Sequence, residues 1–310
     1  MKIVFMGTPQ AAVPSLEKLL SDGHEIIAVW TQPDKPAGRG NKLRASPVKE
    51  FALANDLKVY QPAKIKTRES LELFRSHQAD VAVVVAYGRI LPESFLNSFP
   101  KGAINLHFSL LPEYRGAAPV NWAIAGGETQ SGVTTMKMDV GLDTGDVLQQ
   151  LETEISDGET AIELMSRLSI SGADLLSQTL LKYDELIPKP QDDAKATFAP
   201  IMQKSDGLID WNLKASEINR RIRGFQPFPT SFTVFQNKKL TIWKAGKMEN
   251  GKWKMENAGT IVEINKDDFV VACGHQTFLK ILELQVEGKK RMAVRDFLNG
   301  SKIEIGEKLG

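Results

Sequence analysis

The sequence predicts an α/β fold with a doubly wound, mainly parallel, Rossmann-like sheet, followed by a small OB-like β-barrel domain. Over residues 2–100, short apolar runs that suit strands alternate with amphipathic stretches that suit helices. The run 81–86 is continuously apolar and largely β-branched, as expected for a central parallel strand covered on both faces. After residue 206 the apolar runs are short and closely spaced, which is typical of a small barrel.

Taken in order, the first half alternates strand and helix. We expect strands at residues 2–6, 25–30, 59–60, 81–86, 103–108, 133–138 and 147–154. We expect helices at residues 13–20, 47–55, 69–77 and 160–183, the second of them capped by Ser46 and begun by Pro47. Ligands of such a sheet bind beyond the carboxyl ends of its strands, where Gly7, Tyr87 and His107 would lie.

The second half has a different organisation. Residues 187–205 combine scattered prolines and charges without periodicity, and we interpret them as a linker between domains at 1–186 and 206–310. Ser216 is expected to cap a short helix that carries Arg220, Arg221 and Arg223. Strands are predicted at residues 231–235, 240–245, 259–264, 269–272 and 278–285, with a closing helix near 293–298.

Length and composition limit the class of protein. A chain of 310 residues is long enough for two domains that each bury a core. A single cysteine, Cys273, excludes an internal disulfide framework and fits a reducing compartment. The N-terminus has no signal or transit pattern, and the longest apolar run, 81–86, is too short to span a bilayer. We therefore expect a soluble, cytoplasmic protein, which we predict to be a monomer.

The net charge of +1 conceals an asymmetry between the two halves. Residues 200–310 hold 19 Lys and Arg against 13 Asp and Glu, a net charge of +6. Residues 1–199 hold 20 against 25, a net charge of −5. A basic second half is compatible with a polyanionic partner and also with an ordinary solvated face.

A second basic feature is the loop 32–44, which is longer than a strand-to-helix connection needs. It contains Lys35, Arg39, Lys42 and Arg44, and its glycines and prolines lead us to predict no regular element there. It can be interpreted as a mobile surface loop or as a basic finger that orders on a phosphate backbone. Its length and charge together favour the second interpretation.

The residues that suggest chemistry lie between positions 102 and 146. Asn105 and His107 are two residues apart on a predicted strand, so their side chains point to the same face. The loop 139–146, which includes Asp143, holds three acids and two glycines. Such a composition is poor strand or helix sequence and is typical of a binding or catalytic loop.

An amide, an imidazole and a carboxylate at one cleft suit acyl transfer without a covalent intermediate. The amide and a protonated imidazole can donate hydrogen bonds to an oxyanion, and a carboxylate can favour the charged imidazole and relay a proton from an attacking amine. No activated nucleophile is evident, since Cys273 lies in the other domain and Ser109 has no base of its own. The four histidines have no ligand spacing, so we expect no metal.

Other interpretations of these residues stay open at this point. A lone strand histidine such as His107 is often a satisfied buried residue, and Asp143 could cap its own loop. An enzyme that binds NAD is disfavoured, because only Gly7 follows the first strand where the fingerprint needs Gly-x-Gly-x-x-Gly.

Three motifs in combination resemble the 10-formyltetrahydrofolate-dependent formyltransferases. They are Asn105-x-His107 followed by Ser109-Leu110-Leu111-Pro112, then RGAAP at 115–119, then DVGLDTGD at 139–146. Within that group the chain is similar to the methionyl-tRNA formyltransferases at residues 7–9, 31–34, 36–40, 84–88, 209–211 and 223–229. The resemblance spans nearly the whole chain, although Phe108 stands where it leads us to expect glycine.

The resemblance implies that Asn105, His107 and Asp143 are catalytic. It implies that 10-formyltetrahydrofolate is a consumed formyl donor, that methionyl-initiator tRNA is the acceptor, and that translation initiation is the process served. We expect the folate to be bound by Tyr87, Gly88, Ser109, Leu110, Leu111, Pro112, Asp139 and Gly141. We expect the tRNA to be bound by Lys35, Arg39, Lys42, Arg44, Lys204, Arg220 and Arg223.

Two alternative functions stay open in the sequence. A formyltransferase for a small amine, such as a purine precursor or an amino sugar, would share the three catalytic residues but would have no use for the basic loop and basic second domain. A non-catalytic RNA-binding protein would keep the basic features, yet it would have no reason for Asn105, His107 and Asp143 to converge.

Overall fold

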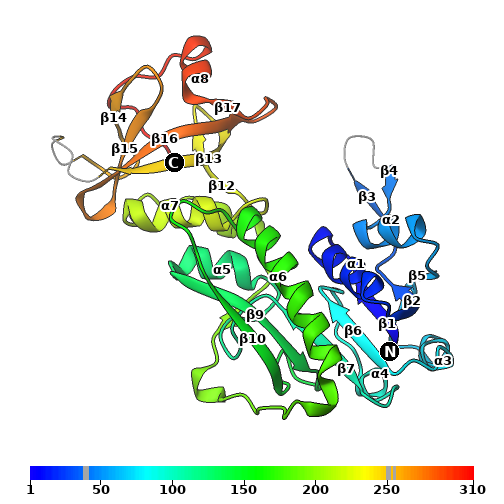
Figure 1. The fold of residues 1–310 in the computed structure, drawn as a ribbon. Coiled ribbons are helices and arrows are strands. Elements are labelled where there is room, and N and C mark those ends of the chain that lie inside the picture. Colours follow the sequence, from blue (N-terminus) through cyan, green and yellow to red (C-terminus); the bar gives the residue numbers. More distant parts are fainter. Residues whose placement is uncertain (38–41, 249–252, 254–255) are drawn as a thin grey trace. The chain divides into compact units, whose positions relative to one another are not determined.

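The computed structural model of the chain describes residues 1–37, 42–248, 253 and 256–310 (Figure 1). Contacts between Cα atoms divide it into two compact units. The N-terminal unit consists of Met1–Pro119, Gln130–Glu154 and Met165–Pro200, and the C-terminal unit of Val120–Thr129, Ile155–Leu164 and Ile201–Gly310. Helix α6 (Ala161–Leu181) begins in the C-terminal unit and ends in the N-terminal unit.

The N-terminal unit is built on a seven-stranded sheet in the order β10-β9-β7-β6-β1-β2-β5. Its strands are β1 (Lys2–Gly7), β2 (Glu25–Trp30), β5 (Val59–Tyr60), β6 (Val81–Val85), β7 (Ala103–His107), β9 (Gln130–Lys137) and β10 (Val147–Glu154). The pairs from β7 to β5 are parallel, whereas β9 is antiparallel to β7 and β10 is antiparallel to β9. The predicted doubly wound, mainly parallel sheet is confirmed.

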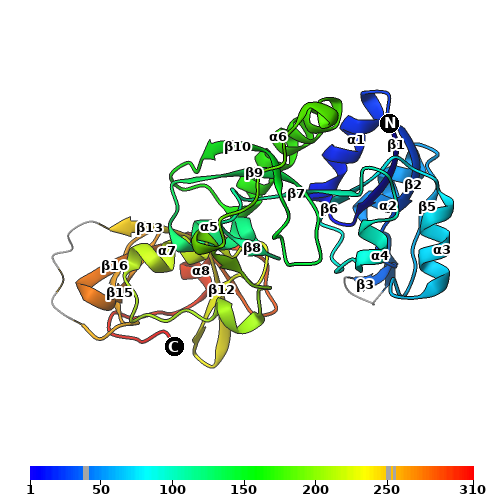
Figure 2. The ribbon, with the colours of Figure 1, turned by 90° about the horizontal axis from the view of Figure 1, so that it is seen from below.

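Helices cover both faces of this sheet. They are α1 (Val13–Ser21), α2 (Pro47–Ala54), α3 (Arg68–Ser76), α4 (Glu93–Leu96) and the later part of α6. One face packs Trp30 and Val84 against Phe74 of α3 and Phe95 of α4 in a buried cluster. In Figure 2, α1 and α6 lie on the other side of the strands. With both faces covered, β6 is buried along its whole length, which explains its continuous apolar run.

Local sequence signals explain where several helices begin. The Ser46 hydroxyl accepts a hydrogen bond from the Lys49 backbone N–H at 3.1 Å and Pro47 follows it, as expected for the start of α2. Each strand and helix predicted before residue 184 is present, with ends shifted by a few residues. The sequence analysis missed α4, which is a single turn, and α5 (Pro119–Gly126), which is apolar around most of its circumference and so shows no amphipathic period.

The loop 32–44 differs from its prediction, because it contains regular structure. Strands β3 (Lys35–Ala37) and β4 (Lys42–Arg44) form an antiparallel hairpin, and residues 38–41 lie outside the described residues. Asp34 anchors the base of the hairpin by accepting hydrogen bonds from Lys49 Nζ at 2.7 Å and from Gln61 Nε2 at 2.8 Å. Proline does not prevent this pairing, since a two-stranded ribbon leaves edges where its missing N–H is tolerated.

The first part of the predicted linker packs on the N-terminal unit. Lys189 and Val147 exchange two backbone hydrogen bonds of 2.8 Å each. Strand β11 (Phe198–Ala199) pairs in parallel with β8 (Arg115–Gly116). Residues 187–200 therefore belong to the N-terminal unit and residues from 201 onward to the C-terminal unit. The boundaries of the two predicted domains stay a prediction.

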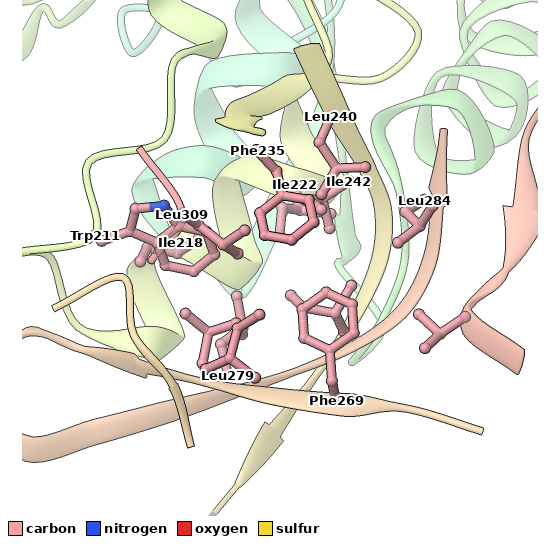
Figure 3. Close-up of a cluster of buried hydrophobic side chains, with 14 of the residues drawn as sticks. Trp211, Ile218, Ile222, Phe235, Leu240, Ile242, Phe269, Leu279, Leu284 and Leu309 are labelled. Carbon is pink, nitrogen blue, oxygen red and sulfur yellow. The ribbon is translucent and has the colours of Figure 1, made fainter. Parts of the chain in front are cut away.

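The C-terminal unit is an antiparallel sheet in the order β12-β13-β16-β15-β14, with β17 paired to β16. The strands are β12 (Ser231–Phe235), β13 (Lys238–Met248), β14 (Ile261–Ile264), β15 (Phe269–Cys273), β16 (Thr277–Val286) and β17 (Met292–Ala293). The helices are α7 (Ala215–Gly224) and α8 (Val294–Gly300). Figure 3 shows the core, in which Ile218 and Ile222 of α7 face Phe269 and Leu279 of the sheet.

Helix α7 begins two residues earlier than a cap at Ser216 predicts, and Ser216 is not its cap. The N-cap is Lys214, whose backbone N–H donates to the Glu217 carboxylate at 3.0 Å. The acid three residues later therefore satisfies the N-cap, and Ser216 lies within the first turn.

The remaining regular segments are single 3-10 turns. They are Gln10–Ala12, Tyr183–Glu185, Asp193–Lys195, Lys204–Gly207 and Gly274–Gln276. Within the described ranges, no helix is long and apolar enough to cross a membrane.

Candidate active site

The carboxyl ends of β1, β6 and β7 meet at one edge of the sheet, as the topology requires. The Thr8 hydroxyl after β1 donates to the carbonyl of Tyr87 after β6 at 3.0 Å. Gln32, which follows β2, donates from Nε2 to the carbonyls of Tyr87 at 3.1 Å and Gly88 at 2.8 Å. These hydrogen bonds fix the loops at this edge relative to one another.

Strand β7 places Asn105 and His107 on the same face. Asn105 lies opposite Val84 of β6 and Met136 of β9, so the strand that carries it is paired on both sides. Asn105 is 7% exposed and His107 is 6% exposed. Both polar side chains are therefore buried on one face of a strand that is buried along its whole length, and they share that face as the alternating pattern predicted.

The contacts of His107 indicate which face of its ring meets a backbone carbonyl and which meets a carboxylate. Its Nε2 lies 3.0 Å from the carbonyl oxygen of Tyr114. A carbonyl oxygen only accepts, so Nε2 must carry a hydrogen and donate it. Its Nδ1 lies 3.7 Å from Oδ2 of Asp143. At that distance the carboxylate is a close electrostatic neighbour of the ring, but it is not a hydrogen-bond partner of Nδ1.

Asp143 approaches His107 from the loop between β9 and β10. Its Oδ2 accepts a hydrogen bond from the backbone N–H of Gly116 at 2.9 Å, and its side chain is 16% exposed. Its backbone has φ +52°, in the left-handed region that non-glycine residues seldom adopt. This conformation must be maintained by contacts around it, and it is a usual feature of functional loops.

Two other features define the loop around Asp143. Asp139 accepts hydrogen bonds from the Gly141 backbone N–H at 3.0 Å and from the Thr144 hydroxyl at 2.7 Å. At Gly145 an added Cβ would lie 1.9 Å from the carbonyl oxygen of Lys137, so only glycine fits. The glycines and acids that the sequence analysis noted in this loop therefore shape it from within.

The structure brings two further residues to the site that the sequence analysis missed. Gln191 donates from Nε2 to the carbonyls of Asp143 at 2.9 Å and Gly145 at 2.7 Å. Arg115 donates to Oε1 of Gln191 from Nε at 3.0 Å and from Nη2 at 2.8 Å. Arg115 appeared only as part of the RGAAP motif, and Gln191 lies in the segment interpreted as a linker, where no local pattern marks it.

The segment expected to line the folate pocket is tightly held. The Ser109 hydroxyl donates to the Glu113 carbonyl at 2.6 Å. Thr134 of β9 accepts from the Leu111 N–H at 3.1 Å and donates to the Ser109 carbonyl at 2.6 Å. Ser109 and Leu111 are buried, whereas Leu110 and Pro112 are partly exposed. Phe108, at the position where glycine was expected, is also buried.

Tyr87 lies differently from the other predicted folate residues. Its side chain is 1% exposed within the aromatic core cluster, and its hydroxyl has no hydrogen-bond partner among the described residues. Burial raises the pKa of this phenol above its ordinary value. Its ring is therefore directed into the core, and a ligand at this edge would meet its backbone. Gly88, Asp139 and Gly141 are exposed, and folate binding by all of these residues stays a prediction.

The residues predicted to bind tRNA lie in three places. Lys35 and Arg44 are exposed on the hairpin, Arg39 lies outside the described residues, and nothing is described of the Lys42 side chain. Lys204 is exposed at the start of the C-terminal unit. Their tRNA contacts stay a prediction.

Arg220 and Arg223 make contacts within the C-terminal unit instead of standing free on its surface. Arg223 donates from Nη1 to the carbonyl of Glu159 at 2.7 Å, and burial lowers the pKa of its guanidinium. The guanidinium of Arg220 lies against Gly127, where an added Cβ would be 2.6 Å from Nη1. Both arginines therefore connect α7 to the other segments of this unit, and any tRNA contact would be additional to that.

No group of three or more His, Cys, Asp and Glu side chains that could hold a metal ion is present in the described part of the chain. Cys273 is buried in the core of the C-terminal unit, and burial raises its pKa to about 12. A thiol with so little thiolate is not a nucleophile at neutral pH.

Models of two protein families match the chain. The family described as formyl transferase matches residues 1–180, and the C-terminal domain of formyl transferases matches residues 201–302. The class of protein that the sheet edge and its three polar side chains define is thus a formyl transferase.

Relatives and solved structures agree with this class. The chain is 49% identical to a methionyl-tRNA formyltransferase of Ruminiclostridium cellulolyticum and 48% identical to one of Alkaliphilus oremlandii, each over 100% of both chains. The fold resembles the sugar 3N-formyl transferase WlaRD, with a TM-score of 0.67 at 20% identity over 94% of this chain and 99% of that one. It also resembles a methionyl-tRNA formyltransferase from Clostridium thermocellum, with a TM-score of 0.58 at 18% identity over 81% and 95%. The chain belongs to the methionyl-tRNA formyltransferase family.

Proposed function

We propose that this chain transfers the formyl group of 10-formyltetrahydrofolate to the α-amino group of methionyl-initiator tRNA and so supports translation initiation. The observation that carries the proposal is the position of His107 between the Tyr114 carbonyl and the Asp143 carboxylate, beside Asn105 on the same strand. This arrangement places an imidazole, an amide and a carboxylate at the edge of the sheet where ligands of this fold class bind.

In the first step the neutral α-amino nitrogen attacks the formyl carbon of the donor. A C–N bond forms, and the π electrons of the formyl carbonyl move to its oxygen, which becomes an oxyanion. The adduct then collapses, re-forming the carbonyl and breaking the bond to N10 of tetrahydrofolate, which leaves and takes up a proton. No covalent bond to the protein is formed in this proposal, because the amine attacks the formyl carbon directly and none of Asn105, His107 and Asp143 acts as a nucleophile.

Asn105 and His107 stabilise the oxyanion in this proposal. The Asn105 amide donates a hydrogen bond, and the imidazolium of His107 contributes its positive charge at a site where both side chains are more than nine-tenths buried. Water screens such interactions poorly at a buried site, so the developing negative charge is stabilised more strongly than it would be in solution. The rigid strand β7 holds both groups in place before the reaction begins.

Asp143 has two tasks in this proposal, one for each carboxylate oxygen. Oδ2 accepts the N–H of Gly116 and places its negative charge beside the imidazole of His107. We assign Oδ1 to the proton that the attacking amine must lose as its C–N bond forms. The same proton can then be returned to the leaving nitrogen of the folate, so that the carboxylate ends the cycle unchanged.

The choice of tRNA over a small amine rests on the relatives at 49% and 48% identity, which carry the name of methionyl-tRNA formyltransferase. It is further supported by the exposed Lys35 and Arg44 of the hairpin and by the net charge of +6 in residues 200–310. The fold alone does not distinguish the two, because sugar formyltransferases share it.

A competition assay tests this function. Purified protein is given 10-formyltetrahydrofolate together with methionyl-initiator tRNA, methionyl-elongator tRNA or a nucleotide-linked amino sugar, and formylated product and free tetrahydrofolate are measured. A gel shift with the two tRNAs is run beside it. We expect formylation of the initiator tRNA in preference to the elongator and no formylated sugar. Formylation of the sugar alone would contradict the tRNA assignment, and tRNA binding without any formyl transfer would contradict the enzymatic one.

A further inference from the structure

We propose that Gln191, with Arg115 behind it, is a positioning residue that holds Asp143 in its working conformation. The proposal deepens the proposed function and rests on it, because it gives Gln191 no task apart from Asp143. Gln191 lies between the segments 1–180 and 201–302 that the two family models match. The contacts of its side-chain amide support this role.

All four hydrogen-bonding capacities of the Gln191 amide are used. The two N–H groups donate to the carbonyls of Asp143 and Gly145, at 2.9 and 2.7 Å. The two lone pairs of Oε1 accept from Nε and Nη2 of Arg115, at 3.0 and 2.8 Å. An amide with this geometry cannot rotate by half a turn without opposing donors to donors and acceptors to acceptors, so its orientation is fixed.

Arg115 fixes the far side of that amide. Its side chain is only 4% exposed, and its Nη2 also donates to Asp193 at 2.8 Å. A buried guanidinium that lost its acceptors would be strongly unfavourable, so Arg115 and Gln191 hold each other in place. The strand pairing of β8 with β11 fixes the backbone of Arg115 as well.

The dipeptide Arg115–Gly116 acts on both the backbone and the side chain of Asp143. Arg115 acts through Gln191 on the Asp143 carbonyl, and the neighbouring residue Gly116 donates its N–H to Oδ2 of the Asp143 carboxylate at 2.9 Å. Asp143 has φ +52°, a conformation that is unfavourable for a residue other than glycine unless its surroundings impose it. The two hydrogen bonds from Gln191 hold the carbonyls of Asp143 and Gly145, and so maintain this turn.

The sharpest test is Gln191→Glu. At neutral pH the variant carboxylate keeps the shape of the side chain and gains an ion pair with Arg115, but it has no hydrogen to donate to the two loop carbonyls and repels them. We expect kcat to fall by about tenfold to a hundredfold, since displacement of a catalytic group by about 1 Å has effects of that size. KM for the tRNA should stay within about twofold. The matched control is Gln178→Glu, the same change at an exposed position on α6, which should leave kcat unchanged.

A double variant separates positioning through Asp143 from a general structural role. Once Asp143→Asn has removed the carboxylate, Gln191→Glu has nothing left to position, so the double variant should be no slower than Asp143→Asn alone. Rates are measured under single-turnover conditions with enzyme in excess. Multiplication of the two effects would overturn the proposal, because it would mean that Gln191 acts independently of Asp143.

The remaining outcomes distinguish this proposal from the proposed function. If Gln191→Glu turns over normally while Asp143→Asn is impaired, the positioning role is wrong and the function stands. If Asp143→Asn itself turns over normally, the assignment of Asp143 fails and this proposal fails with it. If Gln191→Glu does not fold, Gln191→Met replaces it, since methionine fills the same length of side chain without charge and removes all four hydrogen bonds. Normal kcat in Gln191→Met would overturn the proposal.

Discussion

Replacement of Asp143 by Asn removes one negative charge from the site with little change of shape. Gly116 donates its N–H to Oδ2 of Asp143, so the amide oxygen of the variant will occupy that position and the amide nitrogen will take the place of Oδ1. Asn also tolerates the left-handed backbone at φ +52° better than most residues, so the loop can keep its conformation. The variant therefore tests charge and proton transfer separately from geometry.

The size of the effect follows from the separation of the charges. Two unit charges 3.7 Å apart, the distance from Nδ1 of His107 to Oδ2 of Asp143, attract by about 4.5 kcal/mol at an effective dielectric constant of about 20 and by about 1.1 kcal/mol in bulk water. The side chains are 6% and 16% exposed, which places the pair nearer the first value. Since about 1.4 kcal/mol corresponds to a factor of ten, and the variant also lacks the base, we expect kcat to fall by at least about a hundredfold.

The assay is formyl transfer to methionyl-initiator tRNA at saturating folate, with the midpoint of urea unfolding measured beside it. The midpoint should barely change, because Asp143 is not a core residue. Asp146→Asn is the matched control, since it removes the same charge from the same loop three residues away and should leave kcat within about twofold. Near-normal turnover of Asp143→Asn would refute the reasoning, because it would show that neither the charge beside His107 nor the carboxylate base limits the reaction.

Three further predictions concern the two ligands and the core. A folate analogue should protect the backbone amides of residues 87–88 and 109–112 from hydrogen exchange, with little change after residue 206; protection confined to the C-terminal unit would place the folate elsewhere. Arg39→Ala should lower kcat/KM for tRNA by a factor equivalent to about 1–3 kcal/mol, the range for one good charged contact to nucleic acid, and Arg39→Lys should recover part of it; an unchanged value would mean that Arg39 has no part in tRNA binding. Tyr87→Phe should stabilise the fold by about 1 kcal/mol in urea unfolding, because it removes a buried hydroxyl without a partner; a lower midpoint would show that the hydroxyl is satisfied.

Local patterns in the sequence were sufficient for the strand that carries Asn105 and His107. An alternating apolar run specifies a strand and assigns its faces, and both properties need only neighbouring residues. The cap at Ser46 and the buried strand β6 are local in the same sense. Where the sequence misled, the decisive contacts were distant along the chain. The hairpin β3–β4 is anchored through Asp34 to Gln61, which is 27 residues away, and no pattern within the loop records that contact.

The burial of Tyr87 could not be predicted for a related reason. A tyrosine after a buried strand and before a glycine suits a pocket wall, and the sequence cannot state into which layer its ring turns. The structure directs the ring into a cluster with Phe95 and Phe99 of the segment that covers this face. The cost of burying an unpartnered hydroxyl is offset by the apolar area that the ring contributes to the core.

The position of Asp143 shows why the segment 187–200 cannot be treated as a tether. The carboxylate that faces His107 is held by Gly116 from one segment and by Gln191 from another, and Gln191 lies 48 residues from Asp143 in the sequence. A flexible linker would gain nothing from a side chain whose four hydrogen-bonding capacities are all satisfied. The chain between 187 and 200 also adds a strand to β8 and a bridge to Val147. These backbone contacts hold the segment against Arg115–Gly116, which contacts Asp143, and against Val147 at the end of the loop that carries Asp143. It follows that the geometry of the site depends on residues beyond the sheet that defines the fold, and that shortening this segment would disturb the reaction before it disturbed the core.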